Sequence, residues 1–257
     1  MSAKRSSVRL KDRRQRESYV LYGVVFVLVS AALVGTAYVT RLPDVTISSI
    51  SVTGAVHVDV GAVSSTVEAV LDGSYALVVP KRMSYVVPQG AVAAAVVHAF
   101  PGVESVQVER TSTRSLLVRI TERTPHALWC AETCYRMDAY GLVFAPAEPK
   151  DIYRVYEGGA LEIGQIFLSG DFQDFDRFVT LAEGLSPSRI PRVRIDGTDA
   201  FLYLENGGEV RVMHTADPES TAARLEAIFT SNSFEIAKTL EYVELRFGNK
   251  ALVKYRE

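Results

Sequence analysis

The stretch LWCAETCYRMD contains the only two cysteines of the chain. Their thiols are the side chains with the most obvious chemistry. Cys130 and Cys134 are separated by three residues and lie between runs of strand-forming residues. A hairpin with a three-residue loop would set them across from each other, at a Cα separation of about 4.5 to 5.5 Å that suits a disulfide. We therefore expect a disulfide, which would stabilise the fold by about 2 kcal/mol if it acts by constraining the unfolded chain.

Two other uses of these cysteines remain open. A zinc site needs more ligands than two cysteines and the distant His126 provide. A catalytic cysteine is the stronger alternative, because Thr133-Cys134 followed by Arg136 resembles the site of sortases, which are membrane-anchored, β-rich transpeptidases that use Cys, His and Arg. The second cysteine argues against a free nucleophile. Thiol labelling before and after reduction would separate the two interpretations.

Other catalytic constellations are missing from the sequence. The histidines are scattered, and no HExxH, glycine-rich phosphate-binding or GxSxG motif is present. No nucleophile lies at a credible spacing from a base for peptidoglycan hydrolysis or transfer. We therefore expect a non-enzymatic protein without catalytic residues, cofactor, metal site or small-molecule substrate. The histidines are His57, His98, His126 and His214.

The stretch LEYVELRFGNKALVKYRE, residues 240–257, predicts a β-hairpin, because two runs of strand-forming residues flank Gly248-Asn249. A two-residue turn at that pair would place apolar side chains on both faces. A sheet at the end of a small domain usually buries only one face, so the second face and the open edge need a cover. On this register one face carries Val243, Leu245, Phe247 and Leu252, and the other carries Tyr242, Ala251, Val253 and Tyr255.

The second strand of this hairpin is the predicted binding site for a protein partner. Its open edge offers backbone donors and acceptors that another strand can complete, and no further element follows to cover it. Val253 and Tyr255 would fill apolar recesses, while basic side chains would pair with acidic residues of the partner. The alternative is that the hairpin only completes its own sheet, which fits Val243, Leu245 and Phe247 best. The predicted contact residues are Arg246, Phe247, Lys250, Ala251, Leu252, Val253, Lys254 and Tyr255.

Residues 41–122 are predicted to form a small α+β domain in the order strand, helix, helix, strand, strand. An apolar content of 48% and a charged content of 23% indicate a folded chain, and its length of 257 residues allows two small domains. Asp59 can cap the first helix, and Pro88 opens the second. The expected strands cover 47–54, 102–111 and 114–123, and the apolar positions of the first helix are Val60, Val63, Val67 and Val70.

Residues 123–257 are predicted to form a mainly antiparallel β domain with two inserted helices. The first helix, over 171–185, is amphipathic, and the second begins at Asp217-Pro218 with Asp as its cap. The expected strands, besides the final hairpin, cover 126–130, 134–138, 141–147, 191–196, 200–205 and 209–214. The inward helical positions are Phe172, Phe175, Val179 and Ala182 in the first helix and Ala222, Leu225 and Phe229 in the second.

The N-terminal region predicts a single membrane-spanning helix. Residues 1–17 carry seven basic and two acidic residues, whereas the remaining 240 residues carry a net charge of −7. The helix, 18–40, contains 22 uncharged residues from Tyr19 to Thr40, which span roughly 33 Å and so cross a hydrocarbon core of about 30 Å. The basic flank places the N-terminus in the cytoplasm and residues 41–257 outside. A cleavable signal peptide is the alternative, although its apolar stretch is shorter, about 7 to 15 residues.

Four stretches of the sequence, in register over nearly the whole exported part, resemble the bacterial cell-division protein family called FtsQ or DivIB. They are ISVTG, VESVQVERTSTRSLLVRITERTPHALW, YRMDAYGLVF and YVELRFGNKALVK. A basic tail, one membrane helix, a small POTRA domain and a β domain, in that order, is the layout of that family. Two features depart from it, namely the cysteine pair and Glu244, where the family would have Asp.

The resemblance implies a scaffold of the division machinery, located at the septum in the cytoplasmic membrane. Members of that family bind two single-pass proteins, FtsB and FtsL, and link early cytoplasmic components to septal peptidoglycan synthesis. Their final β-hairpin is the principal docking edge for FtsB, which corresponds here to Arg246 and Phe247 on the first strand and to residues 251–255 on the second. The implied partners are FtsB- and FtsL-type proteins and the membrane, without nucleic acid. A sortase-like cysteine transpeptidase and a POTRA module that binds outer-membrane proteins are the alternatives.

Overall fold

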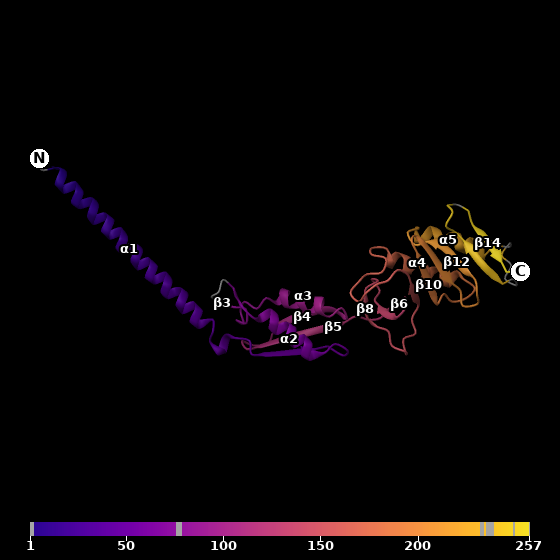
Figure 1. Cartoon of the computed structure of the whole chain (residues 1–257), viewed down its shortest axis with the longest axis horizontal. Coiled ribbons are helices and arrows are strands. Elements are labelled where there is room, and N and C mark those ends of the chain that lie inside the picture. The colour runs from indigo at the N-terminus through magenta and orange to yellow at the C-terminus, as the bar shows by residue number, and fades with distance from the viewer. Residues whose placement is uncertain (1–2, 76–78, 232–233, 235–238, 249, 257) are drawn as a thin grey trace. The chain divides into compact units, whose positions relative to one another are not determined.

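The computed structural model describes residues 3–75, 79–231, 234, 239–248 and 250–256, with side chains of the first helix from Tyr19 onward. The architecture is α+β, with one long apolar N-terminal helix, a small mixed sheet and a nine-stranded mixed sheet (Figure 1). Contacts divide the chain into two units, Met1–Glu122 and Arg123–Glu257. Each unit has a hydrophobic core of its own.

The first helix, α1, runs without a break from Ala3 to Val39. Its apolar part, Tyr19–Val39, has 21 residues and a mean hydropathy of 2.3, and none of its side chains is buried. This helix has the length and composition of a membrane anchor or of a signal sequence. The helix is longer than the expected span over 18–40, because the lysines, arginines and glutamine of the preceding segment also favour helix.

The remaining elements of the first unit are η1 (Pro43–Val45), β1 (Ser49–Thr53), α2 (Val60–Leu71), β2 (Ser74–Tyr75), β3 (Val79–Pro80), α3 (Gln89–Ala99), β4 (Val103–Arg110) and β5 (Ser115–Glu122). The sheet order is β1-β5-β4, with β1 parallel and β4 antiparallel to the central strand. The predicted order strand, helix, helix, strand, strand is confirmed. The two-residue strands β2 and β3, which pair with each other, were not expected.

The helices α2 and α3 pack on this sheet through valine, leucine and isoleucine side chains. Asp59 caps α2 as predicted, since its carboxylate accepts a hydrogen bond of 2.9 Å from a backbone N–H of the first turn. Val63 and Val67 are fully buried, which confirms the helical spacing. Val60 is 46% exposed instead of buried, and Leu71 occupies the core at the other end of the helix.

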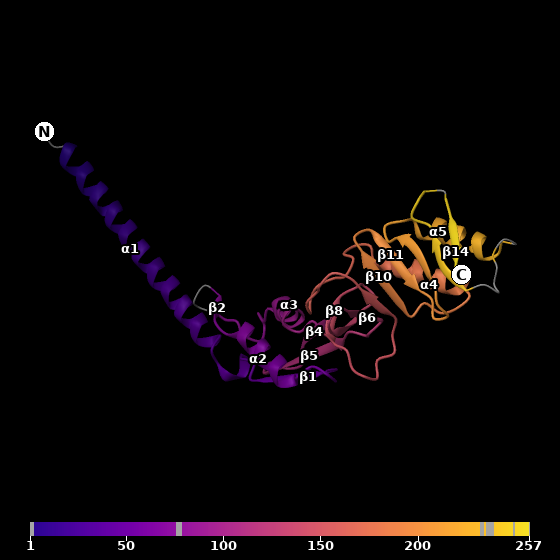
Figure 2. The same cartoon turned by 45° about the vertical axis from the view of Figure 1, so that its right-hand side comes forward.

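The elements of the second unit are β6 (Ala127–Cys130), β7 (Cys134–Met137), β8 (Val143–Pro146), β9 (Val155–Glu157), α4 (Phe172–Leu185), β10 (Arg192–Asp196), β11 (Asp199–Tyr203), β12 (Glu209–Met213), α5 (Pro218–Phe229), β13 (Leu240–Glu244) and β14 (Leu252–Tyr255). The strands form one sheet in the order β14-β13-β12-β11-β10-β9-β6-β7-β8 (Figure 2). The antiparallel meander β6-β7-β8 and the antiparallel run β10-β11-β12 confirm the sequence prediction.

The large sheet is mixed, and the expectation of a mainly antiparallel sheet missed its parallel pairings. The strand β9 was not predicted, and it lies between β6 and β10, parallel to both. The helix α5 connects β12 to β13, which are also parallel. A parallel pair needs a crossover connection instead of a tight turn, and a three-residue strand shows no alternation that could reveal it.

The helices α4 and α5 pack together on one face of the large sheet. Phe172, Phe175, Val179 and Ala182 of α4 are buried as predicted, and so is Leu225 of α5. These side chains share a single core with alternate residues of strands β10 to β14. This arrangement leaves the other alternate residues of the same strands on the opposite face.

The opposite face of the large sheet carries arginines that lie over aromatic rings of neighbouring strands. The described helices of the second unit, α4 and α5, pack on the other face. The pairs, measured from the guanidinium carbon to the ring centre, are Arg192 with Tyr203 at 4.3 Å, Arg194 with Phe201 at 4.9 Å and Arg211 with Tyr242 at 3.9 Å. Such cation–π contacts keep the ring faces covered while the charges stay in water.

Candidate functional site

The hairpin of β13 and β14 has a different register from the one that a two-residue turn predicts. Val253 lies opposite Val243, and Leu252 lies opposite Glu244. The predicted register would have placed Leu252 opposite Leu245. The predicted grouping of faces is therefore wrong, because a shift of one residue turns every side chain of the second strand to the other face.

A longer connection between the two strands explains this shift. The N–H of Lys250 donates to the carbonyl oxygen of Phe247 at 3.0 Å, which closes a four-residue turn. Gly248 has a φ of 51°, a left-handed conformation that glycine adopts without a steric penalty. Asn249, the other half of the predicted turn, lies outside the described residues.

The shift places two of the predicted contact residues of β14, Val253 and Tyr255, on the core face. Val253 and Tyr255 are partly buried and pack against the core of their own unit. The ring of Tyr255 lies 6.2 Å from that of Phe234. Leu252 and Lys254 lie instead on the open face, where Leu252 is 57% exposed.

The backbone of Val253 points away from β13. The N–H of Arg256 donates to the carbonyl oxygen of Thr239 at 2.9 Å, on the β13 side of the strand. Backbone groups alternate in direction along a strand, so those of Lys254 and Leu252 also point toward β13. The N–H and C=O of Val253 therefore point outward.

The two ends of the large sheet differ in how their edges are covered. At the β8 end, the N–H of Val143 donates to Gln165 at 2.9 Å, and its carbonyl oxygen accepts from Gly164 at 2.7 Å. These bonds occupy the outer side of β8. At the β14 end, no backbone hydrogen bond covers the outer side of Val253 among the residues that the structure describes. An uncovered edge of this kind is a template for another strand.

Arg246 was predicted to contact the partner, and its guanidinium is held within its own chain. It donates to Glu244 at 2.8 Å and 2.6 Å and also bonds Asp199. Burial raises the pKa of Glu244, but the hydrogen bonds and the charge of Arg246 outweigh burial and lower it. The same hydrogen bonds raise the pKa of Arg246. The pair therefore stays ionised and fixes the end of β13.

The other predicted contact residues lie at the surface. Phe247 is 63% exposed, and Lys250 and Ala251 are exposed beside it. The ammonium group of Lys254 lies 3.0 Å from the carboxylate of Glu241 on the neighbouring strand. Together with Leu252, these residues form an exposed border along β14 and its connection, which we call the β14 border: Phe247, Lys250, Ala251, Leu252 and Lys254.

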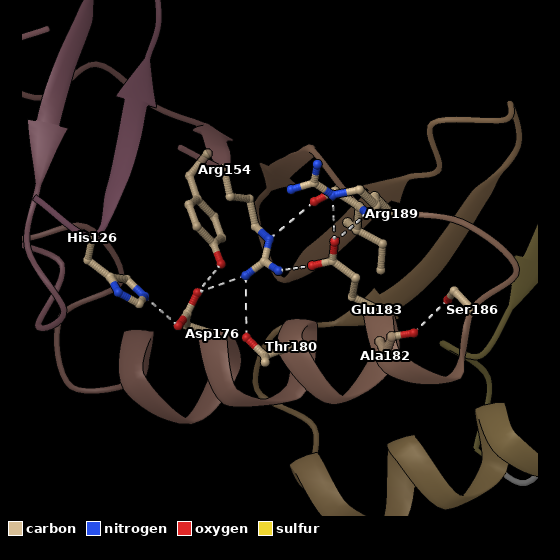
Figure 3. Close-up of polar contacts among 10 residues, drawn as sticks. His126, Arg154, Asp176, Thr180, Ala182, Glu183, Ser186 and Arg189 are labelled. Atoms are coloured by element: carbon tan, nitrogen blue, oxygen red, sulfur yellow. Dashed lines mark hydrogen bonds and ion pairs between the residues drawn. The ribbon is translucent and has the colours of Figure 1, made fainter. Parts of the chain in front are cut away.

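A second group of polar side chains lies on α4 and on the segments that lead into β6 and β9 (Figure 3). Arg154 is at its centre, with its Nε donating to the carbonyl oxygen of Ile190 at 3.1 Å. One terminal nitrogen of Arg154 lies 3.3 Å from Asp176, and the other bonds Glu183. The Nε2 of His126 lies 2.8 Å from the other oxygen of Asp176.

Burial and hydrogen bonding within the cluster shift the pKa values of the groups around Arg154. The hydrogen bond to Asp176 raises the pKa of His126. Burial raises the pKa of Asp176, but hydrogen bonds from His126 and Tyr156 outweigh burial and lower it. Tyr156 is buried, and burial raises its pKa well above the ordinary value, so its hydroxyl remains a donor to Asp176.

The Arg154 cluster ties α4 to the segments that precede β6 and β9. It lines a cavity of about 450 Å³ whose lining holds neither Ser nor Cys, and both of its central carboxylates are occupied by Arg154. The cluster was not predicted, because its members come from separate segments of the chain. One signal was available, since Asp176, Thr180 and Glu183 have the spacing of one helix face.

Cys130 and Cys134 form a disulfide across the β6–β7 hairpin, with a Cα separation of 4.1 Å. The other residues of the sortase-like alternative have different partners. Arg136 bonds Asp151 at 2.7 Å, and His126 belongs to the Arg154 cluster. Among the described residues, no three His, Cys, Asp or Glu side chains form a group that could hold a metal ion.

Comparison of the chain with models of known protein families and with curated proteins finds no match. The resemblance to FtsQ or DivIB therefore rests on the quoted motifs and their order, and it stays a prediction. The candidate site for binding is the edge of β14 with the β14 border.

Proposed function

We propose that this protein is a non-enzymatic, single-pass membrane scaffold of the FtsQ or DivIB type, whose exported part binds a partner by addition of a strand to β14. The observation that carries the proposal is the uncovered outer side of Val253 at one end of the large sheet. The opposite end, at β8, is covered by the chain itself. Among the described residues, β14 is therefore the end of the sheet that offers an open place for an added strand.

The chemistry of the β14 border supports the same role. An added strand gains main-chain hydrogen bonds from Val253, and its alternate side chains lie against the border. Leu252 and Phe247 offer exposed apolar surface, which stabilises a complex when water is removed from it. Lys250 and Lys254 favour a partner with acidic residues beside its strand.

The part of the proposal that concerns the N-terminal unit rests on α1 and the small sheet. We propose that α1 is an uncleaved anchor with its basic flank in the cytoplasm and that the small α+β unit is a POTRA-type domain. The partners would then be FtsB- and FtsL-type single-pass proteins that meet the scaffold at the septum. No nucleic acid, cofactor or small-molecule substrate is part of this proposal.

Two substitutions at Val253 test the proposal, because they differ in one hydrogen-bond donor. Val253→Pro closes the side chain onto the backbone nitrogen and so removes the outward N–H, whereas Val253→Ala shortens the side chain and keeps the N–H. Each variant would carry a photo-crosslinking amino acid at position 252 in living cells. We expect the alanine variant to be crosslinked to a small membrane protein at about the wild-type yield, and the proline variant to lose at least about 90% of the crosslink, since each good backbone pair contributes about 1 kcal/mol and the added strand also loses its register.

Circular dichroism of the purified variants gives the control for folding. Equal crosslinking of the proline and alanine variants, with both folded, would contradict strand addition at β14. A wild-type protein that gives no crosslink at position 252 would contradict the partner itself.

A further inference from the structure

Arg224 joins the helix α5 to both ends of the connection between β13 and β14. One terminal nitrogen of its guanidinium donates to the carbonyl oxygen of Leu245 and to that of Lys250, each at 3.2 Å. Leu245 directly follows β13, and Lys250 lies two residues before β14 begins. A single half-buried side chain of the helix therefore bridges the two backbone segments that leave and enter the hairpin.

The same connection is held from the other face of the sheet by Arg246, through Glu244 and Asp199. Between these two arginines, the turn itself contributes one described hydrogen bond, from Lys250 to Phe247. The strand that follows is only four residues long. A short edge strand frays readily, so its conformation depends on what fixes its first residues.

We propose that Arg224 is a positioning residue that presets the outer edge of β14 for a partner strand without touching the partner. This inference rests on the proposed function of β14 as a docking edge. The guanidinium suits the task because its rigid, planar donors reach two acceptors at once, which a lysine ammonium on a flexible stem does less well. The clamp removes conformational freedom before the partner arrives, so less is lost on binding.

The affinity for a partner depends on the fraction of molecules in which β14 already has the conformation that binds a strand. If only a fraction of the protein holds β14 in the competent conformation, the apparent dissociation constant rises by the inverse of that fraction. Loss of Arg224 therefore weakens binding although every contact residue of the β14 border is unchanged. The weakened step is association, because the complex, once formed, holds β14 through the added strand itself.

Three variants of the full-length protein test the clamp. Arg224→Met keeps the stem and removes all donors, Arg224→Lys keeps one charged donor group, and Arg177→Met is the matched control on α4. Arg177 is exposed and forms an ion pair with Asp174 one turn away. Hydrogen exchange of the detergent-solubilised protein would report on the clamp, and crosslinking in cells from position 252 would report on the partner.

For Arg224→Met we expect amides of residues 245–256 to exchange at least about tenfold faster, which is the effect of losing even one hydrogen bond to a charged donor. Exchange in α4 and β10 should stay unchanged, and the crosslink yield should fall at least about fivefold as the competent fraction falls. The lysine variant should be intermediate in both measurements. Arg177→Met should match the wild type in both.

Two results would overturn the inference. Unchanged exchange over 245–256 in Arg224→Met would show that no clamp exists. Faster exchange with an unchanged crosslink yield would show that the clamp does not serve binding. A wild-type protein without any crosslink at position 252 would contradict the proposed function instead, and the exchange measurement would still decide whether Arg224 fixes the hairpin.

Discussion

The carboxylate of Glu122 holds a loop of the first unit in place through several hydrogen bonds. One of its oxygens accepts hydrogen bonds from the backbone N–H groups of Val56, His57 and Val58, at 2.7, 2.8 and 3.0 Å. Its other oxygen lies 2.8 Å from the Nδ1 of His57. The last residue of β5 therefore fixes the loop that leads from β1 into α2, whose N-cap, Asp59, follows directly.

We expect Glu122→Gln to loosen that loop, because the neutral amide is a weaker acceptor for three donors. Burial raises the pKa of Glu122, but the hydrogen bonds of His57, Val58 and Val56 outweigh burial and lower it from 4.5 to about 2. The stabilisation by the charged form is therefore complete above about pH 4.5 and is lost as the pH falls toward 2. The measure is hydrogen exchange of residues 56–58, which should be several-fold faster in the variant at pH 7. Equal exchange at pH 7 would contradict this prediction.

The Arg154 cluster supplies a second prediction at this scale. Asp176 has a side chain that is 14% exposed and contacts Arg154, His126 and Tyr156, whereas Asp174 on the same helix is 70% exposed. Asp176→Asn should lower the free energy of unfolding by about 2 to 4 kcal/mol, because it leaves the buried charge of Arg154 undercompensated. The control Asp174→Asn should change it by less than about 0.5 kcal/mol. Urea unfolding followed by circular dichroism measures both, and similar values for the two would refute a central role for Asp176.

The pH dependence of the cluster follows from His126. The pKa of His126 is raised in the folded protein, so its contribution is complete below the ordinary value of 6.5 and is lost as the pH rises through the folded value. The difference in stability between the wild type and His126→Gln should therefore be larger at pH 5.5 than at pH 8.5. A difference that does not depend on pH would show that the His126 to Asp176 contact carries no charge.

At the scale of elements, the β6–β7 hairpin depends on its disulfide. The buried Cys130 lies directly opposite the exposed Cys134. The double substitution Cys130→Ser with Cys134→Ser should lower the free energy of unfolding by about 2 kcal/mol, since the bond closes a short loop. Thiol labelling of the native protein gives the complementary measurement: labelling should occur only after reduction. A cysteine that labels without reduction would favour the sortase-like alternative.

Elements with local signals were predictable, and elements fixed by distant partners were not. Asp59 and Asp217 cap α2 and α5 as expected, because a cap is decided within three residues of the chain. The register of β14 was wrong by one residue, because the length of its connection depends on contacts with Arg224 and Arg246 and not on the Gly248-Asn249 pair alone.

The same reason explains what was missed at the candidate sites. The position of the final hairpin could be predicted from its alternating residues, but which of its side chains face water could not. Arg246 is a basic residue of the hairpin and was therefore predicted to contact a partner. Asp199, far away in the sequence, bonds it within the fold instead. The Arg154 cluster likewise joins residues from four separate segments, so no single stretch of sequence predicts it.

At the scale of the whole molecule, α1 decides where the two folded units work. A membrane anchor keeps its apolar segment, whereas a signal sequence is removed during export. We expect the mature protein to keep the full mass of 28.2 kDa and to stay with the membrane in alkaline carbonate. Deletion of residues 1–40 with a cleavable signal in their place should give a protein that folds outside the membrane but no longer sediments with it. A mature protein that begins near Arg41 in the wild type would contradict the anchor.

The arginines that lie over Tyr203, Phe201 and Tyr242 affect how two copies of the sheet can associate. A broad, uncovered β-sheet face would otherwise adhere to any similar surface, including a second copy of itself. Here two such faces approaching each other would bring layers of guanidinium groups into contact before their rings could meet. The guanidinium groups therefore oppose face-to-face stacking of two sheets. The sheet is extended only at its edge, by one strand at a time.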